Sequence, residues 1–128
     1  MTRMGRPRRA ARAAALALAA AVPLAAPQAL TASFVTKVTR TLNTPDGEFG
    51  SCMVALAESP MDHGLDCPPG RWVTIDCAGQ LEPTDRLAAL ATFETAQMAL
   101  IADRTVRVWV DDTHKIAGWC RVKRLDVW

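Results

Sequence analysis

Two short apolar runs, Cys52-Met-Val-Ala-Leu-Ala57 and Trp72-Val-Thr-Ile-Asp-Cys77, indicate the fold of this 128-residue chain. Each run has the composition of a strand, and the segment between them is dense in proline, glycine and aspartate. The pattern predicts two antiparallel strands joined by a long loop. In an end-to-end register Cys52 lies directly opposite Cys77, close enough for a disulfide. We therefore expect a Cys52–Cys77 bridge. The other two cysteines, Cys67 and Cys120, then form the second bridge.

A first strand and a single helix are expected on either side of this pair. Residues 34–42 are rich in valine and threonine and end at a turn signal, 43–47, that contains proline and glycine. Residues 85–102 follow Thr84 as a plausible N-cap and predict the helix. We expect this helix to cover the open end of a sheet, with Met98 as core filler. Its apolar side chains recur at helical spacing as Leu87, Leu90, Ala91, Met98 and Ile101, widened by Phe93, Ala96 and Leu100.

Two more strands are expected after the helix. Residues 106–110 alternate valine with other side chains, which predicts a strand with one buried face, and the polar run 111–115 is expected to be a turn. Residues 116–128 alternate in two phases, so we expect a bulge or bend near Lys123-Arg124.

The order of these elements defines the fold class. It is β-β-β-α-β-β, mainly β with one helix, stapled by two disulfides. This is the order of the five-stranded OB-fold barrel, which binds oligonucleotides and oligosaccharides in other proteins. A ferredoxin-like alternation is less favoured because only one helix is expected.

The first 33 residues differ in composition from the rest of the chain. They hold five arginines and no acidic residue, and residues 13–26 form an apolar stretch that is shorter than a typical transmembrane helix. We interpret residues 1–33 as a signal peptide, cleaved between Ala26 and Ser33, followed by one domain at 34–128. The protein is then periplasmic or secreted, with no membrane span.

The whole chain has a formal net charge of +2, but the sign of the charge reverses when the leader is left out. Residues 34–128 contain ten basic and thirteen acidic residues, which gives a formal charge of −3. An acidic exported domain is not expected to bind nucleic acid, although Arg121, Lys123 and Arg124 form a late basic cluster. Four cysteines in an oxidising compartment favour two disulfides over a zinc site.

The sequence offers no catalytic motif, and we expect no catalytic residue, metal or cofactor. It has two histidines and lacks the nucleophile-elbow, metalloprotease, P-loop and dinucleotide patterns. Aspartate and histidine are common in turns, so two groups with metal-ligating side chains are interpreted as turn residues. The first group is Asp62, His63 and Asp66, and the second is Asp111, Asp112 and His114. An envelope enzyme would instead need a cleft that joins the residues of the second group.

The four tryptophans are more informative, because the chain has no tyrosine and all four lie in expected strands. Trp109 lies on the face opposite the alternating valines and beside Arg107. An indole in such a position can cover part of the barrel, stack on a sugar ring, or become buried in a protein interface. We take Trp109 and Arg107 as the candidate ligand or interface residues.

The expected domain resembles a group of small exported bacterial proteins whose function is unassigned. The resemblance covers nearly the whole domain and is carried by Gly70-Arg-Trp-Val-Thr74 with Cys77, Thr95-Ala-Gln-Met-Ala-Leu100, Val110-Asp-Asp112, and Gly118 with Cys120. More distantly, the chain resembles the OB-fold binding subunits of bacterial A-B toxins of the subtilase-cytotoxin and pertussis-like kind. The shared features are the placement of two cysteines, one helix and the run Thr105-Val-Arg-Val-Trp-Val110. This resemblance implies a homo-oligomeric ring and binding of cell-surface glycans.

These observations favour an exported, non-enzymatic binding domain whose partner is a glycan or a protein. The alternative hypothesis is a periplasmic structural or envelope-maintenance protein that has no soluble ligand.

Overall fold

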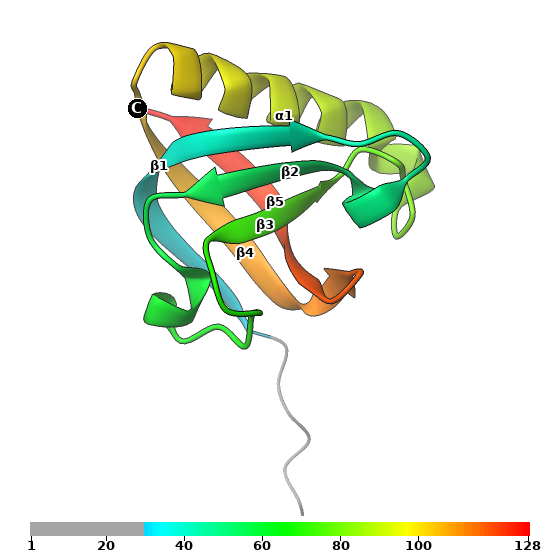
Figure 1. Cartoon of the computed structure of the whole chain (residues 1–128), viewed down its shortest axis with the longest axis horizontal. Coiled ribbons are helices and arrows are strands. Elements are labelled where there is room, and N and C mark those ends of the chain that lie inside the picture. Colours follow the sequence, from blue (N-terminus) through cyan, green and yellow to red (C-terminus); the bar gives the residue numbers. More distant parts are fainter. Residues whose placement is uncertain (1–29) are drawn as a thin grey trace, which may run out of the picture.

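The computed structural model describes residues 30–128, which form a five-stranded sheet and one α-helix (Figure 1). The expected order of strands and helix is confirmed. Residues 1–29 of the expected leader lie outside the described residues, whereas residues 31–33 belong to the first strand. The strands are β1 (Thr31–Asn43), β2 (Ser51–Leu56), β3 (Trp72–Asp76), β4 (Thr105–Ile116) and β5 (Trp119–Val127). The helix is α1 (Arg86–Ile101), and the loops contain the 3-10 helices η1 (Glu48–Gly50), η2 (Pro60–His63) and η3 (Pro83–Asp85).

The sheet closes on itself in a ring, in the order β1-β2-β3-β5-β4. Strand β1 takes part in two ladders, because its residues 31–37 pair with β4 and its residues 38–43 pair with β2. The register shifts between Val38 and Arg40, where one ladder gives way to the other. The parallel neighbours β3 and β5, which pair through Thr74 and Arg121, complete the ring.

The core lies inside the ring and under α1, which runs along one side of it (Figure 1). The valines of β4 behave as the alternation predicts, since Val106, Val108 and Val110 are fully buried. From α1 the buried side chains are Phe93, Ala96 and Ala99.

The expected buried face of the helix is only partly right, since Phe93 and Ala96 are buried and Leu90 and Leu100 pack against the core. Leu87, Met98 and Ile101 are 81%, 65% and 80% exposed, so Met98 is not core filler. The helix carries apolar side chains around most of its circumference, so spacing alone does not identify the face that packs. The face that packs is centred on Phe93, Ala96 and Ala99, of which Ala99 was not expected.

Both disulfides pair as expected, but the register that led to the first one is wrong. Cys52 is opposite Ile75, two residues before Cys77, and the chain leaves the sheet after Asp76. Beyond this point the Asp76 carboxylate holds the next segment, because it accepts the backbone N–H groups of residues 80–82 at 2.7, 2.9 and 3.2 Å. A shift of two residues keeps every side chain on its face, so Cys52 and Cys77 still meet, with Cα atoms 5.7 Å apart.

The last hairpin differs from the expectation at its turn. Strand β4 continues through the polar run 111–115, and the chain reverses at Ala117 and Gly118 with φ of 50° and 83°. Two successive positive φ values match the right-handed twist of a two-residue hairpin. The expected bulge is confirmed, because Trp109 pairs with Arg124 while Val110 pairs with Val122, which leaves Lys123 unpaired between them.

Replacing Cys67 and Cys120 together by alanine is expected to lower the free energy of unfolding by about 4 kcal/mol, since this bridge spans 53 residues of sequence. The Cys52–Cys77 bridge spans 25 residues, and the matched double alanine variant should lose about 3.5 kcal/mol. Urea unfolding at constant pH measures both losses. Peptide mapping without reduction checks the pairing, and a fragment that joins Cys52 to Cys67 would contradict the structure.

The leader should be removed before Thr31. Ala32 and Ser33 pair with β4, and the Leu30 N–H donates to Asp112 at 3.2 Å, so a cut after Ser33 would remove the start of β1 from the sheet. Intact-mass measurement of the exported protein gives the new N-terminus. A mature chain that begins at Phe34 would contradict this prediction.

Candidate binding surface

The outer surface of β1, β4 and β5 presents two tryptophans among basic side chains. Alternation along β4 turns Arg107 and Trp109 away from the core, opposite the fully buried valines. We call this surface the arginine–tryptophan face. It comprises Ser33, Val35 and Lys37 of β1, Thr105, Arg107 and Trp109 of β4, and Arg124, Asp126 and Trp128 at the end of the chain.

Each tryptophan of this face is stacked under an arginine. The Arg124 guanidinium lies 4.7 Å from the centre of the Trp109 ring, and the Arg107 guanidinium lies 5.1 Å from that of Trp128. Stacking of a cation on an indole is favourable and holds the long side chain in place. Arg107 and Trp109, the two candidates from the sequence, therefore share this face. Trp109 stacks with Arg124 of β5, and Arg107 stacks with Trp128, the residue after β5.

The two arginines differ in their acceptors. Arg124 forms two hydrogen bonds to the Asp126 carboxylate, at 2.9 and 2.7 Å, and these bonds and the carboxylate charge raise the pKa of Arg124. Arg107 is opposite Asp126 in the β4–β5 register, but this carboxylate is already held by Arg124. Among residues 30–128, no hydrogen-bond or ion-pair partner of the Arg107 side chain is found.

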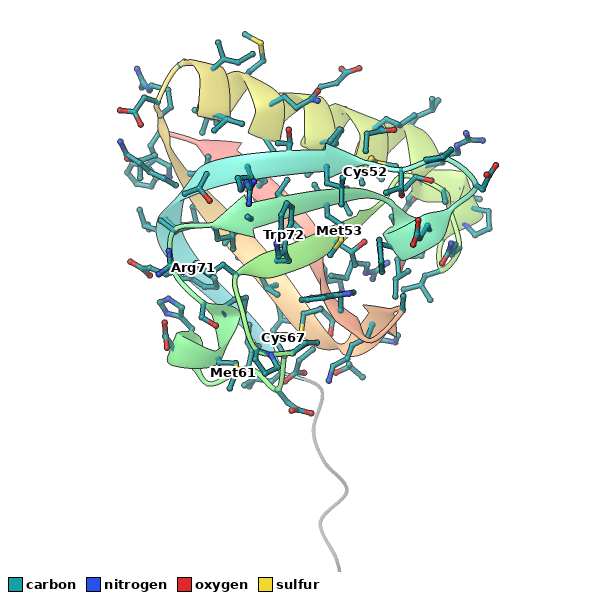
Figure 2. The ribbon with its side chains drawn as sticks, viewed as in Figure 1. Cys52, Met53, Met61, Cys67, Arg71 and Trp72 are labelled. Carbon is teal, nitrogen blue, oxygen red and sulfur yellow. A yellow bond between two sulfur atoms is a disulfide. The ribbon has the colours of Figure 1, made fainter. Side chains whose placement is uncertain are left out.

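The opposite outer surface, over β2 and β3, is largely sealed. Met53 and Trp72 lie on this side (Figure 2), with Met53 only 3% exposed and Trp72 half-buried. The β4–β5 hairpin and η1 cover the surface, because Ile116 is buried there and Thr74 donates to the Phe49 carbonyl. Gly50 has φ of 77°, and a Cβ atom at this position would lie 2.9 Å from Thr74 Oγ1 and 3.2 Å from Ile116 Cδ1.

A small cavity of about 110 Å³ lies between the start of α1 and strands β3 and β5. Sequence reasoning missed this site because it depends on Arg121, which is 5% exposed although it lies in a basic cluster. Its Nη2 lies 3.3 Å from Glu82 Oε1, and its buried Nε has no partner in the described part of the chain. Arg121 holds the pKa of Glu82 below its usual value, through a hydrogen bond and through its charge.

The late basic cluster is therefore not a continuous groove. Arg121 is buried against Glu82, Arg124 is paired with Asp126, and Lys123 is exposed at the bulge. Single-stranded nucleic acids need a basic groove that follows the backbone together with free aromatic faces. This arrangement does not provide one.

Only part of the second candidate metal group is brought together. Asp111 is 2% exposed, accepts the Thr113 N–H at 2.8 Å, and lies 3.0 Å from His114 Nδ1. Asp112 is directed elsewhere and accepts the N–H groups of Leu30 and Asp66, at 3.2 and 3.0 Å. These carboxylates hold backbone segments together, which is a structural role.

The first candidate metal group is dispersed. His63 stacks on Phe34 with ring centres 3.8 Å apart and lies 2.8 Å from Glu58. Asp62 caps η2, and Asp66 pairs with Lys115 at 3.3 Å. No cluster of three metal-ligating side chains occurs within residues 30–128.

Comparison of the chain with protein-family models, with curated proteins and with solved structures finds no match in any of the three. Within the described residues, no helix is long and apolar enough to cross a membrane. A functional proposal for this protein therefore depends on the geometry of its surfaces.

Asp111 should have a pKa below 3.8 in the folded protein. Burial acts to raise the pKa, but the hydrogen bonds from His114 and from the Thr113 N–H outweigh it. A lowered folded-state pKa adds stability above the unfolded-state value, and this stability is lost as the pH falls through the folded-state pKa. Asp111→Asn should therefore cost about 1–2 kcal/mol at pH 7, and this cost should shrink as the pH falls below 3.8.

Urea unfolding as a function of pH measures this effect, and carboxyl NMR titration measures the pKa directly. His114→Ala is the companion variant, and it should raise the Asp111 pKa while leaving the Thr113 hydrogen bond intact. A folded-state pKa at or above 3.8 would contradict this account.

Proposed function

We propose that this protein is an exported, non-enzymatic OB-fold domain that acts by binding a glycan or a protein partner. The observation that carries the proposal is the arginine–tryptophan face, which holds two ordered indole–guanidinium pairs outside the core. Tryptophan and arginine are the residues most enriched among those that dominate binding energies. A surface built only for solubility does not need them.

The OB-fold assignment is supported by the strand order and by the position of the helix. The ring runs β1-β2-β3-β5-β4, and α1 connects β3 to β4. OB-folds usually bind ligands on the outer side of strands 2 and 3 and on the adjacent loops. That side buries Met53 and Ile116 in this protein, which favours the arginine–tryptophan face as the binding surface.

Export is supported by the composition of residues 1–33 and by the two disulfides, which persist in oxidising compartments. The resemblance to toxin binding subunits adds a ring of identical chains to the proposal. Features that agree with it are Cys52 near the start of β2, Cys77 after β3, the single helix, and the Val-Arg-Val run in β4.

A glycan array and a panel of surface proteins, with mass measurement under native conditions, test this proposal. We expect a specific ligand signal, weakened at least tenfold by Trp109→Ala, because truncation of an interface tryptophan commonly costs about 2 kcal/mol or more. Trp72→Ala, on the sealed surface, is the matched control, and thermal unfolding of both variants checks that they fold.

Three outcomes would contradict the proposal in different ways. A strict monomer without any glycan signal would remove the toxin-like part of it. A ligand that binds Trp109→Ala as tightly as the unmodified protein would remove the arginine–tryptophan face. Cross-linking to envelope components, with no glycan or protein ligand found, would favour the structural alternative.

A further inference from the structure

The Arg107 guanidinium is an ordered cation that lacks an acceptor within the described residues. It is partly buried, it stacks on Trp128, and the carboxylate opposite it is bound to Arg124. A guanidinium in this state has already lost much of its side-chain freedom and part of its hydration. It can form two parallel hydrogen bonds to an incoming oxyanion at little further cost.

The charges around Arg107 favour an acidic partner. Asp126 is neutralised by Arg124, and Asp103 at the end of α1 is paired with Lys37 at 2.7 Å. Arg104 donates to a main-chain oxygen of Trp128 at 2.7 Å, so its charge is already directed at an acceptor and Arg107 remains the cation of this surface that has none. The uncompensated charge of the arginine–tryptophan face is therefore positive, although residues 34–128 as a whole carry a formal charge of −3.

The shape and composition of the surface favour a polypeptide over a sugar. Each indole already has a guanidinium over its ring, so a sugar has fewer ring faces on which to stack. The residues come from neighbouring strands, and they do not line the cavity beside α1. Exposed apolar side chains adjoin them, with Val35 44% and Trp128 60% exposed, as in the interfaces of proteins that bind other proteins.

We propose that the partner is an acidic polypeptide and that Arg107 binds the carboxylate of one of its aspartate or glutamate side chains, with apolar neighbours packing against Trp128 and Val35. This inference rests on the proposed function, because it names the partner of the same face. The inference goes beyond the proposed function in two respects. It assigns the partner to the class of acidic polypeptides, and it gives Arg107 the role of determining specificity.

A display library of random 12-residue peptides, selected on the disulfide-bonded protein, tests the inference. Selected peptides should carry an aspartate or glutamate beside apolar residues. Arg107→Gln should weaken binding of a synthetic selected peptide at least about tenfold, because a hydrogen bond between charged groups is lost. Arg107→Lys should weaken it nearly as much, since an ammonium group cannot form the two parallel bonds.

Two controls separate a specific contact from general attraction. Arg71→Gln removes the same charge just before β3 (Figure 2) and should leave peptide binding unchanged. Replacing the acidic residue of the peptide by its amide should weaken binding to the unmodified protein but have little effect on binding to Arg107→Gln. This double-mutant cycle isolates the pairwise contact.

The same proteins are applied to a glycan array that includes neutral, carboxylated and sulfated glycans. Peptides without acidic residues, or peptides that bind Arg107→Gln as tightly as the unmodified protein, would overturn the inference. Carboxylated or sulfated glycans that depend on Arg107, in the absence of selected peptides, would also overturn it while leaving the proposed function intact. If peptides, glycans and the panel of surface proteins all fail to bind, the proposed function itself fails.

Discussion

Strand β1 pairs with two different neighbours, and this double pairing closes the sheet into a ring. One strand of 13 residues hydrogen-bonds to β4 along its first half and to β2 along its second half, so the sheet must curve and close. Closure turns alternate side chains of every strand inward and leaves no long unpaired edge between β1 and its neighbours. The irregularity between Val38 and Arg40 lets β1 change partners, and the bulge at Lys123 lets β5 follow the curve.

Within this ring, the two disulfides hold segments that the strands do not hold. Cys52–Cys77 ties the end of β3 to the start of β2, and Cys67–Cys120 ties the long loop to β5. A domain of this size buries a limited core, so cross-links that restrict the unfolded chain contribute a large part of its stability. The Asp112 carboxylate also links segments outside the strands, because it accepts backbone N–H groups from Leu30, just before β1, and from Asp66 in the long loop.

The closed sheet has two outer surfaces with different chemistry. Over β2 and β3, the β4–β5 hairpin and η1 bury Met53 and Ile116, and this side has become a second, small apolar cluster. Over β1, β4 and β5 the tryptophans remain at the surface, ordered by stacking with arginines. Exposed aromatic and cationic side chains held in fixed positions lower the entropic cost of binding, which is why the proposed function is placed on this side.

The order of the elements and the burial of the β4 valines could be predicted from the sequence, because they follow from local composition and from the two-residue alternation of a strand. The cysteine pairing was also predicted, although the register behind it was two residues off, because a shift of two residues keeps side chains on the same face. The sequence did not determine the packed face of α1, since Leu87 and Met98 are as apolar as the residues that pack. That face, the two-residue shift of the β2–β3 register and the separation of Arg121, Lys123 and Arg124 are all set by tertiary contacts. Each depends on which distant segment supplies a partner, such as the N–H groups bound by Asp76 or the carboxylates of Glu82 and Asp126, and nothing local in the sequence specifies that partner.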